Sequence, residues 1–477
     1  MGLPASATRQ EIRKAFLDAV KINHPDVNHG SATRFFDLQE AYKVLHDPTR
    51  REAYDSHLRS NDQPKPILLP EIIVSRPFLS RIPEPQRLYF QISLNPGQLN
   101  TAKLVRAEID LVLLVDISSS MKGQKLDEVK LACFKLLGFI QGSDRLRIIT
   151  FNDFANVLVD THDSSKVLLH NKVHSMQAQG GTELFAGLNA GYEAVCSSDL
   201  PNLAHHIVLL TDGQTYGDEA KCAMLAEKAA AAGITISCYG IGADWNDRLL
   251  EEIAMKTGGS CRFLRQGTDF NQTILNDILM VTQSDLPNIT GKINIQSPDR
   301  VVSAFRLQPN PIEIPNGEDL RLGPLPKEGD LEFFLEIEVG PIGVDEESHD
   351  LFTMDLLAKH GQNPSAFIGQ LDISMPVEGT TTLPMPPAEI LKTIHAISIN
   401  RIEQKARYLI EQGKTPEAIQ LLRKLTNLFQ QNGKDNLAKT INLQINAMEN
   451  GSPLSKDADK EIHFKTRALF TPNGELE

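Results

Sequence analysis

Two carboxylates and three hydroxyls are spaced along this chain in a way that favours binding of a hard divalent cation. The five residues are Asp116, Ser118, Ser120, Thr182 and Asp212. Oxygen ligands alone are the set that Mg²⁺ or Ca²⁺ prefers. Because direct carboxylate contact would neutralise the cation's charge only in part, the cation could still attract an external carboxylate. We therefore expect one cation site that leaves a position open for a ligand.

Both carboxylates follow a short apolar run. Asp116 ends the run that begins at Ile109, and Asp212 follows the run 207–210. Runs of this length are typical of buried parallel strands, and ligands bind beyond the carboxyl ends of such strands. Gly180-Gly181 precedes Thr182, and a glycine-supported loop would allow its hydroxyl to face the same point.

The elements that position these residues alternate between strand and helix from about residue 105 to 264. The predicted strands are 110–116, 146–151, 156–159, 206–211, 235–241 and about 260–264. The predicted helices are 124–140, 183–196, 218–232 and 246–257. This alternation predicts a doubly wound α/β domain with a parallel sheet.

Catalysis at the same residues is less well supported. A phosphate-transferring aspartate at 116 would normally have a second carboxylate two residues later, where Ser118 stands. The chain has no G-x-x-x-x-G-K-[ST] phosphate loop. His205 and His206 lie at the start of a predicted strand, away from the site. The prediction is therefore a binding site and no enzyme, with a metal-dependent hydrolase as the least favoured reading.

A second candidate site lies near the N-terminus. His24-Pro25-Asp26 separates a predicted helix that ends before it from a second over about 32–46, and a third runs to about residue 58. The proline ends the first helix because it disfavours helical geometry in the residue before it.

This N-terminal segment resembles a DnaJ-type J domain. The resemblance is carried by the tripeptide and the pattern after it, including Phe35, Leu38, Ala41-Tyr42, Leu45, Asp47-Pro48 and Tyr54-Asp55. It implies that His24, Pro25 and Asp26 dock on a DnaK-type chaperone and stimulate its ATPase. Two features depart from the family: its short first helix is missing before Met1-Gly2-Leu3-Pro4, and Leu17-Asp18 stand where basic residues are common. Both departures imply weaker coupling to a chaperone.

The α/β segment resembles the von Willebrand factor type A domain with its metal-ion-dependent adhesion site. Asp116-x-Ser118-x-Ser120, Thr182 and Thr211-Asp212-Gly213 match the motif in order. The resemblance implies that the two serines and Thr182 bind Mg²⁺ directly, while the aspartates often act through water. Mn²⁺ or Ca²⁺ are alternatives. It also implies a protein ligand that presents an acidic residue.

The regions before and after this domain show other hydrophobic patterns. Residues 88–94 alternate between apolar and polar, and so do several segments between 289 and 377, which predicts a β-sandwich. We expect the α/β domain to be inserted between strands of that sandwich. Four helices are expected at 388–412, 416–431, 436–449 and 456–468, and the first ones form a bundle or a weakly tetratricopeptide-like hairpin.

The predicted organisation is therefore multidomain. It comprises a short α-helical J domain (1–60), a linker (61–70), strands that join the sandwich (71–104), the type A domain (105–284), the β-sandwich (285–378), a linker (379–387) and a helical region (388–477). The order of type A domain, strands and helical tail is similar to a broad bacterial group of cytoplasmic type A domain proteins.

Composition limits the partners. The 477 residues carry a formal net charge of −13, which gives no support to nucleic-acid binding. The five cysteines are scattered without a C-x-x-C pair, as in a reducing compartment. No apolar run approaches the roughly 20 residues of a membrane span. We expect a soluble cytoplasmic protein.

The sequence thus favours a non-enzymatic adapter that couples a DnaK-type chaperone to a partner held through Mg²⁺. The alternative from a different class is a metal-dependent scaffold in a cytoplasmic complex with a non-functional J domain.

Overall fold

The computed structural model describes residues 14–15, 67–98, 108–140, 144–162, 166–198, 203–215, 217–265, 270–343, 345–359, 365–379, 383–452 and 454–470. The chain divides into two compact units, residues 1–65 and 66–477. The predicted chaperone-docking residues His24, Pro25 and Asp26 lie outside the described residues, so the account below concerns the second unit.

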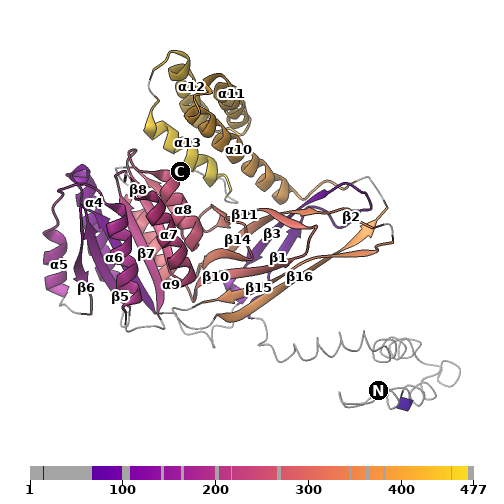
Figure 1. Cartoon of the computed structure of the whole chain (residues 1–477), viewed down its shortest axis with the longest axis horizontal. Coiled ribbons are helices and arrows are strands. Elements are labelled where there is room, and N and C mark those ends of the chain that lie inside the picture. Colours follow the sequence, from indigo (N-terminus) through magenta and orange to yellow (C-terminus); the bar gives the residue numbers. More distant parts are fainter. Residues whose placement is uncertain are drawn as a thin grey trace. The chain divides into compact units, whose positions relative to one another are not determined.

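A six-stranded sheet forms the centre of the α/β domain (Figure 1). Its strands are β4 (Ile109–Asp116), β5 (Arg145–Phe151), β6 (Ala155–Asp160), β7 (Ala204–Thr211), β8 (Thr235–Ile241) and β9 (Cys261–Leu264). They lie in the order β6-β5-β4-β7-β8-β9. Strands β5 and β6 therefore lie on one side of β4, and β7, β8 and β9 lie on the other. The β4–β7 junction is the topological switch point, and such folds bind ligands there.

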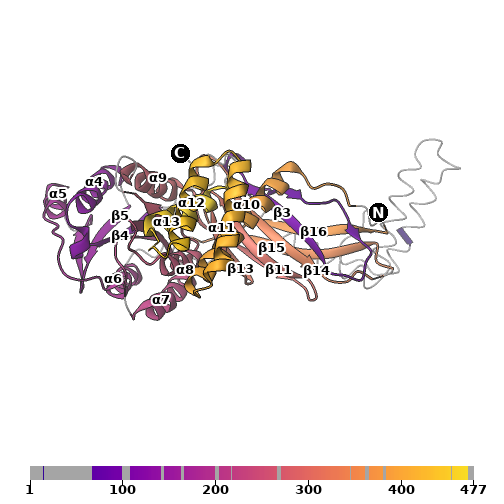
Figure 2. The same cartoon turned by 90° about the horizontal axis from the view of Figure 1, so that it is seen from above.

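Helices cover both faces of this sheet. One apolar core includes α4 (Gln124–Phe139), α5 (Lys166–His174) and α9 (Phe270–Gln283). The other includes α6 (Leu184–Cys196), α7 (Glu219–Ala231) and α8 (Asp247–Thr257). This arrangement, also seen from above in Figure 2, confirms the predicted doubly wound α/β fold.

Two elements differ from the prediction. β6 runs antiparallel to β5, because only a short turn, residues 152–154, joins them. Helix α5 was not predicted. Its residues Val167 and Leu168 are exposed while Leu169 is buried, so its apolar residues do not follow one helical face.

Two five-stranded sheets form a β-sandwich from segments on both sides of the α/β domain. The first has the order β1 (Glu71–Val74), β3 (Gln86–Leu94), β14 (Leu331–Val339), β11 (Arg300–Gln308), β12 (Ile312–Ile314). The second has the order β13 (Asp319–Leu325), β10 (Leu286–Ile295), β15 (Ser348–Ala358), β16 (Ala366–Glu378), β2 (Leu79–Ser80). β3 pairs with β14 along its whole length, from Leu94 opposite Leu331 to Gln86 opposite Val339. This is the pairing that the insertion hypothesis requires.

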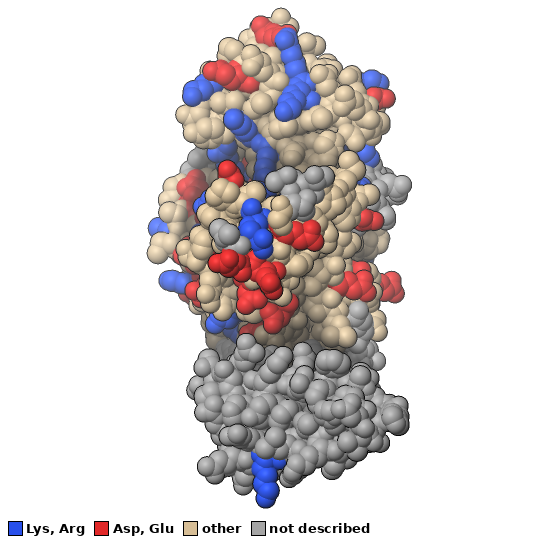
Figure 3. Space-filling model, turned by 90° about the vertical axis from the view of Figure 1, so that its right-hand side faces the viewer, with Lys and Arg blue, Asp and Glu red and all other residues tan. Residues whose placement is uncertain are grey.

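The end of the sandwich that faces the viewer in Figure 3 carries many Asp and Glu side chains in its central part. Neighbouring carboxylates repel polyanions. The picture agrees with the acidic composition of the chain.

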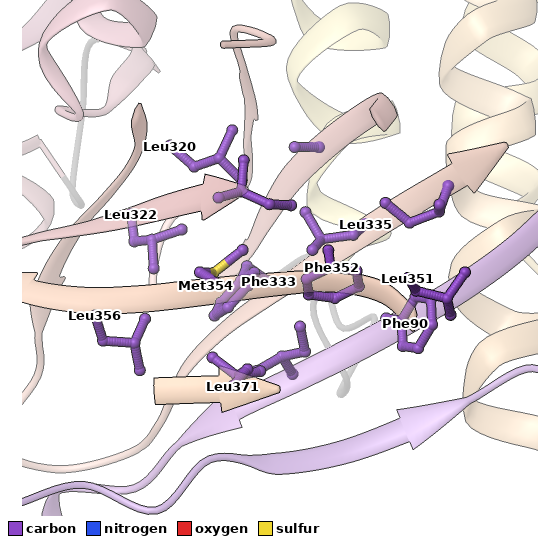
Figure 4. Close-up of a cluster of buried hydrophobic side chains, with 14 of the residues drawn as sticks. Phe90, Leu320, Leu322, Phe333, Leu335, Leu351, Phe352, Met354, Leu356 and Leu371 are labelled. Carbon is purple, nitrogen blue, oxygen red and sulfur yellow. The ribbon is translucent and has the colours of Figure 1, made fainter. Parts of the chain in front are cut away.

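The interior of the sandwich is apolar and tightly interlocked. Figure 4 shows side chains from the two sheets pointing toward one another, among them Phe333 and Met354. Phe90 of β3 meets Phe352 of β15 edge to face, with 5.5 Å between ring centroids. Strand β3 therefore shares one core with strand β15, which lies some 260 residues later in the chain.

Four helices follow the sandwich, namely α10 (Ala388–Glu411), α11 (Thr415–Gln431), α12 (Asp435–Glu449) and α13 (Lys456–Ala468). Helix α10 packs its residues Ile390 and Ile397 against Phe334 on the outer face of the first sandwich sheet. Its Thr393 hydroxyl donates to Gln91 Oε1 of β3 at 2.9 Å. Within the described residues, no helix is long and apolar enough to cross a membrane.

A buried set of charges joins this helical region to the α/β domain. His463 of α13 lies between Glu251 of α8 and Glu403 of α10, at 2.7 Å and 3.0 Å from its two ring nitrogens. Arg467 contacts the same Glu251 at 2.8 Å, and Arg407 contacts Asp247 of α8 at 2.5 Å. Because each charge has an opposite partner, the joint is specific, whereas removing one partner would leave a buried charge uncompensated.

The protonation of His463 decides whether this joint is complete. Both ring nitrogens face carboxylates, and only the imidazolium form can donate from both. Burial alone would lower the pKa of His463, but the charges of Glu251 and Glu403 and their hydrogen bonds outweigh it and raise the pKa to about 9.

We expect the free energy of unfolding to decrease as pH rises from about 6.5 to about 9. The unfolded histidine has a pKa of about 6.5, so its stabilising contribution is complete below that value and is lost toward the folded pKa. Urea unfolding across this range, followed by the emission of Trp245, measures the effect. Trp245 is the only tryptophan of the chain and packs on Phe464 of α13.

His463→Gln should remove this pH dependence and lower stability at pH 6.5. His395→Gln is the control, because His395 is an exposed histidine on α10. If wild type and His463→Gln show the same dependence of Trp245 emission on pH, the ionic account of this joint is wrong.

Candidate functional site

Asp116 and Asp212 lie at the carboxyl ends of the two central strands. Asp116 is the last residue of β4, and Asp212 directly follows β7. The strands are parallel, with Val115 opposite Leu210, so the two carboxylates reach the same edge of the sheet. Every residue of both strands is buried, which explains why their apolar runs are continuous.

Asp116 is held by two donors. Its Oδ1 accepts from the Ser118 backbone N–H at 2.8 Å, and its Oδ2 accepts from the Thr211 hydroxyl at 2.6 Å. Burial raises the pKa of this carboxyl, and these hydrogen bonds oppose the rise only in part. A nearby cation would offset the cost of burying this charge.

A chain of hydroxyls connects the first motif to Asp212. The Ser120 hydroxyl donates to Asp212 Oδ1 at 2.6 Å, and the Ser118 and Ser120 oxygens are 3.0 Å apart. Since a hydroxyl has one hydrogen, Ser120 must accept from Ser118. Ser120 is exposed, which gives an external ligand access to the site.

Thr182 completes the set from the loop before α6. A Cβ atom added to Gly213 would stand 2.8 Å from the Thr182 Oγ1 atom, so this hydroxyl lies beside the residue that follows Asp212. A side chain at position 213 would displace it. The structure thus brings the two carboxylates and three hydroxyls of the sequence prediction to one edge of the sheet.

The glycine loop is fixed by residues that the sequence prediction missed. Gly180 has φ +81°, which favours glycine, and the Asp153 side chain leaves no room for a Cβ there. Asp153 Oδ1 accepts from the Gly181 N–H at 3.0 Å, and Asn152 Nδ2 donates to Gln179 O at 2.9 Å. No spacing rule connects the residues 152–153 to Thr182, because they meet only through the fold.

Lys125 of α4 is the second residue that the prediction missed. Its ammonium group forms an ion pair with Asp212 Oδ2, and its side chain is 20% exposed. Asp212 is therefore shared between a hydroxyl on one oxygen and a positive charge on the other. The ammonium group compensates the charge of Asp212 at this edge of the sheet.

The donor set fits a hard divalent cation. All five side chains offer oxygen and none offers nitrogen or sulfur, as Mg²⁺ or Ca²⁺ requires. Across the part of the chain that the structure describes, no cluster of three or more His, Cys, Asp and Glu residues could hold a metal. The candidate site differs from such clusters because most of its donors are hydroxyls.

The two histidines set aside in the sequence analysis belong to the other end of the sheet. His205 Nδ1 lies 3.2 Å from Asp110 Oδ2, and Asp110 also pairs with Arg147. Burial lowers the pKa of His206 to about 4. These groups lie at the starts of strands β4 and β7, away from Asp116 and Asp212.

Comparisons with protein families agree with this geometry. Residues 110–279 match the von Willebrand factor type A domain, and residues 1–55 match the DnaJ domain. Residues 388–472 match the Sll0103-like, C-terminal alpha-helical domain. The chain carries a DnaJ domain followed by a von Willebrand factor type A domain. The predicted resemblances are confirmed, whereas no comparison tests the five metal ligands.

Curated relatives share only part of their length with the chain. Uncharacterized protein sll0103 of Synechocystis is 30% identical over 166 residues, which are 34% of this chain and 39% of that protein. Bovine inter-alpha-trypsin inhibitor heavy chain H1 is 27% identical over 177 residues, which are 35% of this chain and 20% of that protein. The chain thus spans about two fifths or less of these two relatives.

Solved structures extend the likeness of fold beyond the type A domain. A von Willebrand factor type A protein from Catenulispora acidiphila has a TM-score of 0.66 at 16% identity, covering 84% of this chain and 96% of that one. The ArnB paralog VWA2 from Sulfolobus acidocaldarius has a TM-score of 0.51 at 15% identity, covering 85% and 99%. At this identity the likeness shows the fold alone.

We expect Thr211→Val to destabilise the domain by roughly 1–3 kcal/mol, because it leaves the buried Asp116 Oδ2 without its donor. Thermal unfolding without added metal measures this change. Ser175→Ala is the control, since its hydroxyl donates to Lys172 O at an exposed position and should matter little. Equal effects of the two substitutions would contradict the proposed role of Thr211.

Proposed function

We propose that this protein is a non-enzymatic adapter. The type A domain holds a partner protein through a divalent cation at Asp116, Ser118, Ser120, Thr182 and Asp212, and the DnaJ domain brings a DnaK-type chaperone to that partner. The observation that carries the proposal is the hydrogen-bonded chain from Ser118 through Ser120 to Asp212, beside the buried Asp116.

The chemistry of the ligands favours binding over catalysis. The proposed direct ligands are neutral hydroxyls, and the two aspartates act through water, so a carboxylate from the partner can bind the cation directly. Ser118 and Ser120 are hydrogen-bonded to each other and to Asp212, and no histidine is positioned against them in the described residues to act as a base. Mg²⁺ is the cation proposed, with Mn²⁺ or Ca²⁺ as alternatives.

The match to the DnaJ domain covers His24, Pro25 and Asp26, which supports a DnaK-type partner. The location we propose is the cytoplasm. A scaffold without chaperone activity is the second candidate, favoured by Leu17 and Asp18 at positions where this family commonly has basic residues.

We expect Mg²⁺ to bind the wild-type chain and to bind Asp116→Ala and Ser120→Ala at least ten-fold more weakly, because each substitution removes an oxygen from the set. Isothermal titration calorimetry with Mg²⁺ alone measures this difference. Ser120 is exposed, so that variant separates metal loss from misfolding. Asp127→Ala, an exposed carboxylate on α4, is the control. Unchanged binding in both site variants would remove the metal proposal.

We expect the full chain to stimulate the ATPase of a DnaK-type chaperone and His24→Gln to abolish the stimulation, since the tripeptide is the proposed contact. Steady-state phosphate release measures it, and Ser120→Ala is the control because it alters the other site. Absence of stimulation, or stimulation unchanged by His24→Gln, would favour the scaffold.

A further inference from the structure

A cleft of about 510 Å³ adjoins the proposed metal site. Residues from four elements line it: Lys125 of α4, Gly242 and Ala243 after β8, Arg265 after β9, and Asp457 of α13. The helical region that follows the sandwich therefore supplies one wall, so the surface beside the metal site belongs to two domains.

Lys125 forms the boundary between the site and the cleft. Its ammonium group pairs with Asp212, while its Nζ and Cε atoms lie 3.8 and 3.7 Å from the position that a Cβ on Gly242 would occupy. The same lysine thus contacts a proposed metal ligand on one side and lines the cleft on the other. Lys125 therefore links the proposed metal site to the cleft.

The wall made by α13 is firmly held. Lys460 Nζ donates to Trp245 O at 2.9 Å and lies 4.0 Å from the centroid of the Trp245 ring, whose side chain is buried. Phe464 packs on the same ring at 5.7 Å. Lys456 also pairs with Asp244 at 3.0 Å on the rim. A partner would meet a preformed surface, which lowers the entropic cost of binding.

Arg265 is the residue of this cleft that can exchange one carboxylate partner for another. Its Nη2 atom contacts Glu461 at 2.5 Å and Asp457 at 3.2 Å, and its side chain is 49% exposed. Glu461 is mostly covered, whereas Asp457 is 54% exposed. Exposed ion pairs contribute little net free energy. A carboxylate from outside can therefore replace Asp457 on the guanidinium at low cost.

We propose that the cleft binds a second carboxylate of the partner. The ligand is an acidic segment with two acids: the first completes the cation's coordination, and the second takes the place of Asp457 on Arg265. Lys125 adds positive charge between the two positions. Guanidinium groups bind carboxylates through paired hydrogen bonds, which gives the second position its specificity. This inference rests on the proposed function of the metal site.

The test is selection of peptides from a displayed random library on the full chain in Mg²⁺, followed by affinity measurements with one selected peptide. We expect peptides with two acids, binding that EDTA abolishes, and weaker binding when either acid is changed to its amide. Arg265→Gln should weaken binding by about two- to five-fold, the range expected for an exposed ion pair. Asp457→Asn should strengthen it by about two- to five-fold by removing the competing carboxylate.

Arg423→Gln is the matched control, because Arg423 forms an exposed pair with Glu449 on α11 and α12. Calorimetry should show unchanged Mg²⁺ binding in Arg265→Gln and Asp457→Asn. Mg²⁺-dependent peptides that need one acid only and bind Arg265→Gln as tightly as wild type would overturn the inference and leave the metal proposal standing. Peptides that bind equally in EDTA would overturn both.

Discussion

The parallel pairing of β4 with β7 is the constraint on which the candidate site depends. These strands are distant in sequence, and their ladder brings Asp116 and Asp212 to one edge of the sheet. Both strands are buried on both faces, so a shift of one residue would misplace apolar side chains as well as the two carboxylates. The packing of the core thereby holds two carboxylates close together despite their repulsion. The Thr211 hydroxyl stabilises Asp116, and the Ser120 hydroxyl and Lys125 stabilise Asp212.

Within residues 66–477, the sandwich and the helical region are joined to the α/β domain by contacts of different kinds. The α/β domain is inserted between β3 and β10, whose sandwich has an apolar core. The buried Arg306 of β11 donates to the carbonyl oxygens of Gly258 and Leu322 at 2.8 and 3.1 Å, and so ties the sandwich to the end of α8. The helical region meets α8 through charges such as His463 and Arg407. The loop before α8 and Asp457 of α13 both line the cleft beside Lys125. The helical region is therefore part of the surface that a partner of the metal site would meet.

Much of this arrangement could be predicted because local pattern and tertiary fold agree. The apolar runs before Asp116 and Asp212 predicted strands, and the alternation at 88–94 predicted a sandwich strand that pairs with β14. Short or mixed segments escaped prediction: β2 has two residues, and α5 exposes Val167. Lys125, Asn152 and Asp153 could not be assigned to the site from spacing, since only the fold brings them to it. The carboxylate partners of Arg265, Asp457 and Glu461, come from a helix nearly 200 residues later in the chain, so the sequence could not indicate them.

The most direct test of the metal-dependent account is anomalous diffraction from crystals of the full chain grown with Mn²⁺. We predict one strong peak within roughly 2.0–2.6 Å of hydroxyl oxygens among Ser118, Ser120 and Thr182, with Asp116 and Asp212 around it. A Mn²⁺ peak bound elsewhere, with Ser120 still donating to Asp212 and no density between the hydroxyls, would contradict the account.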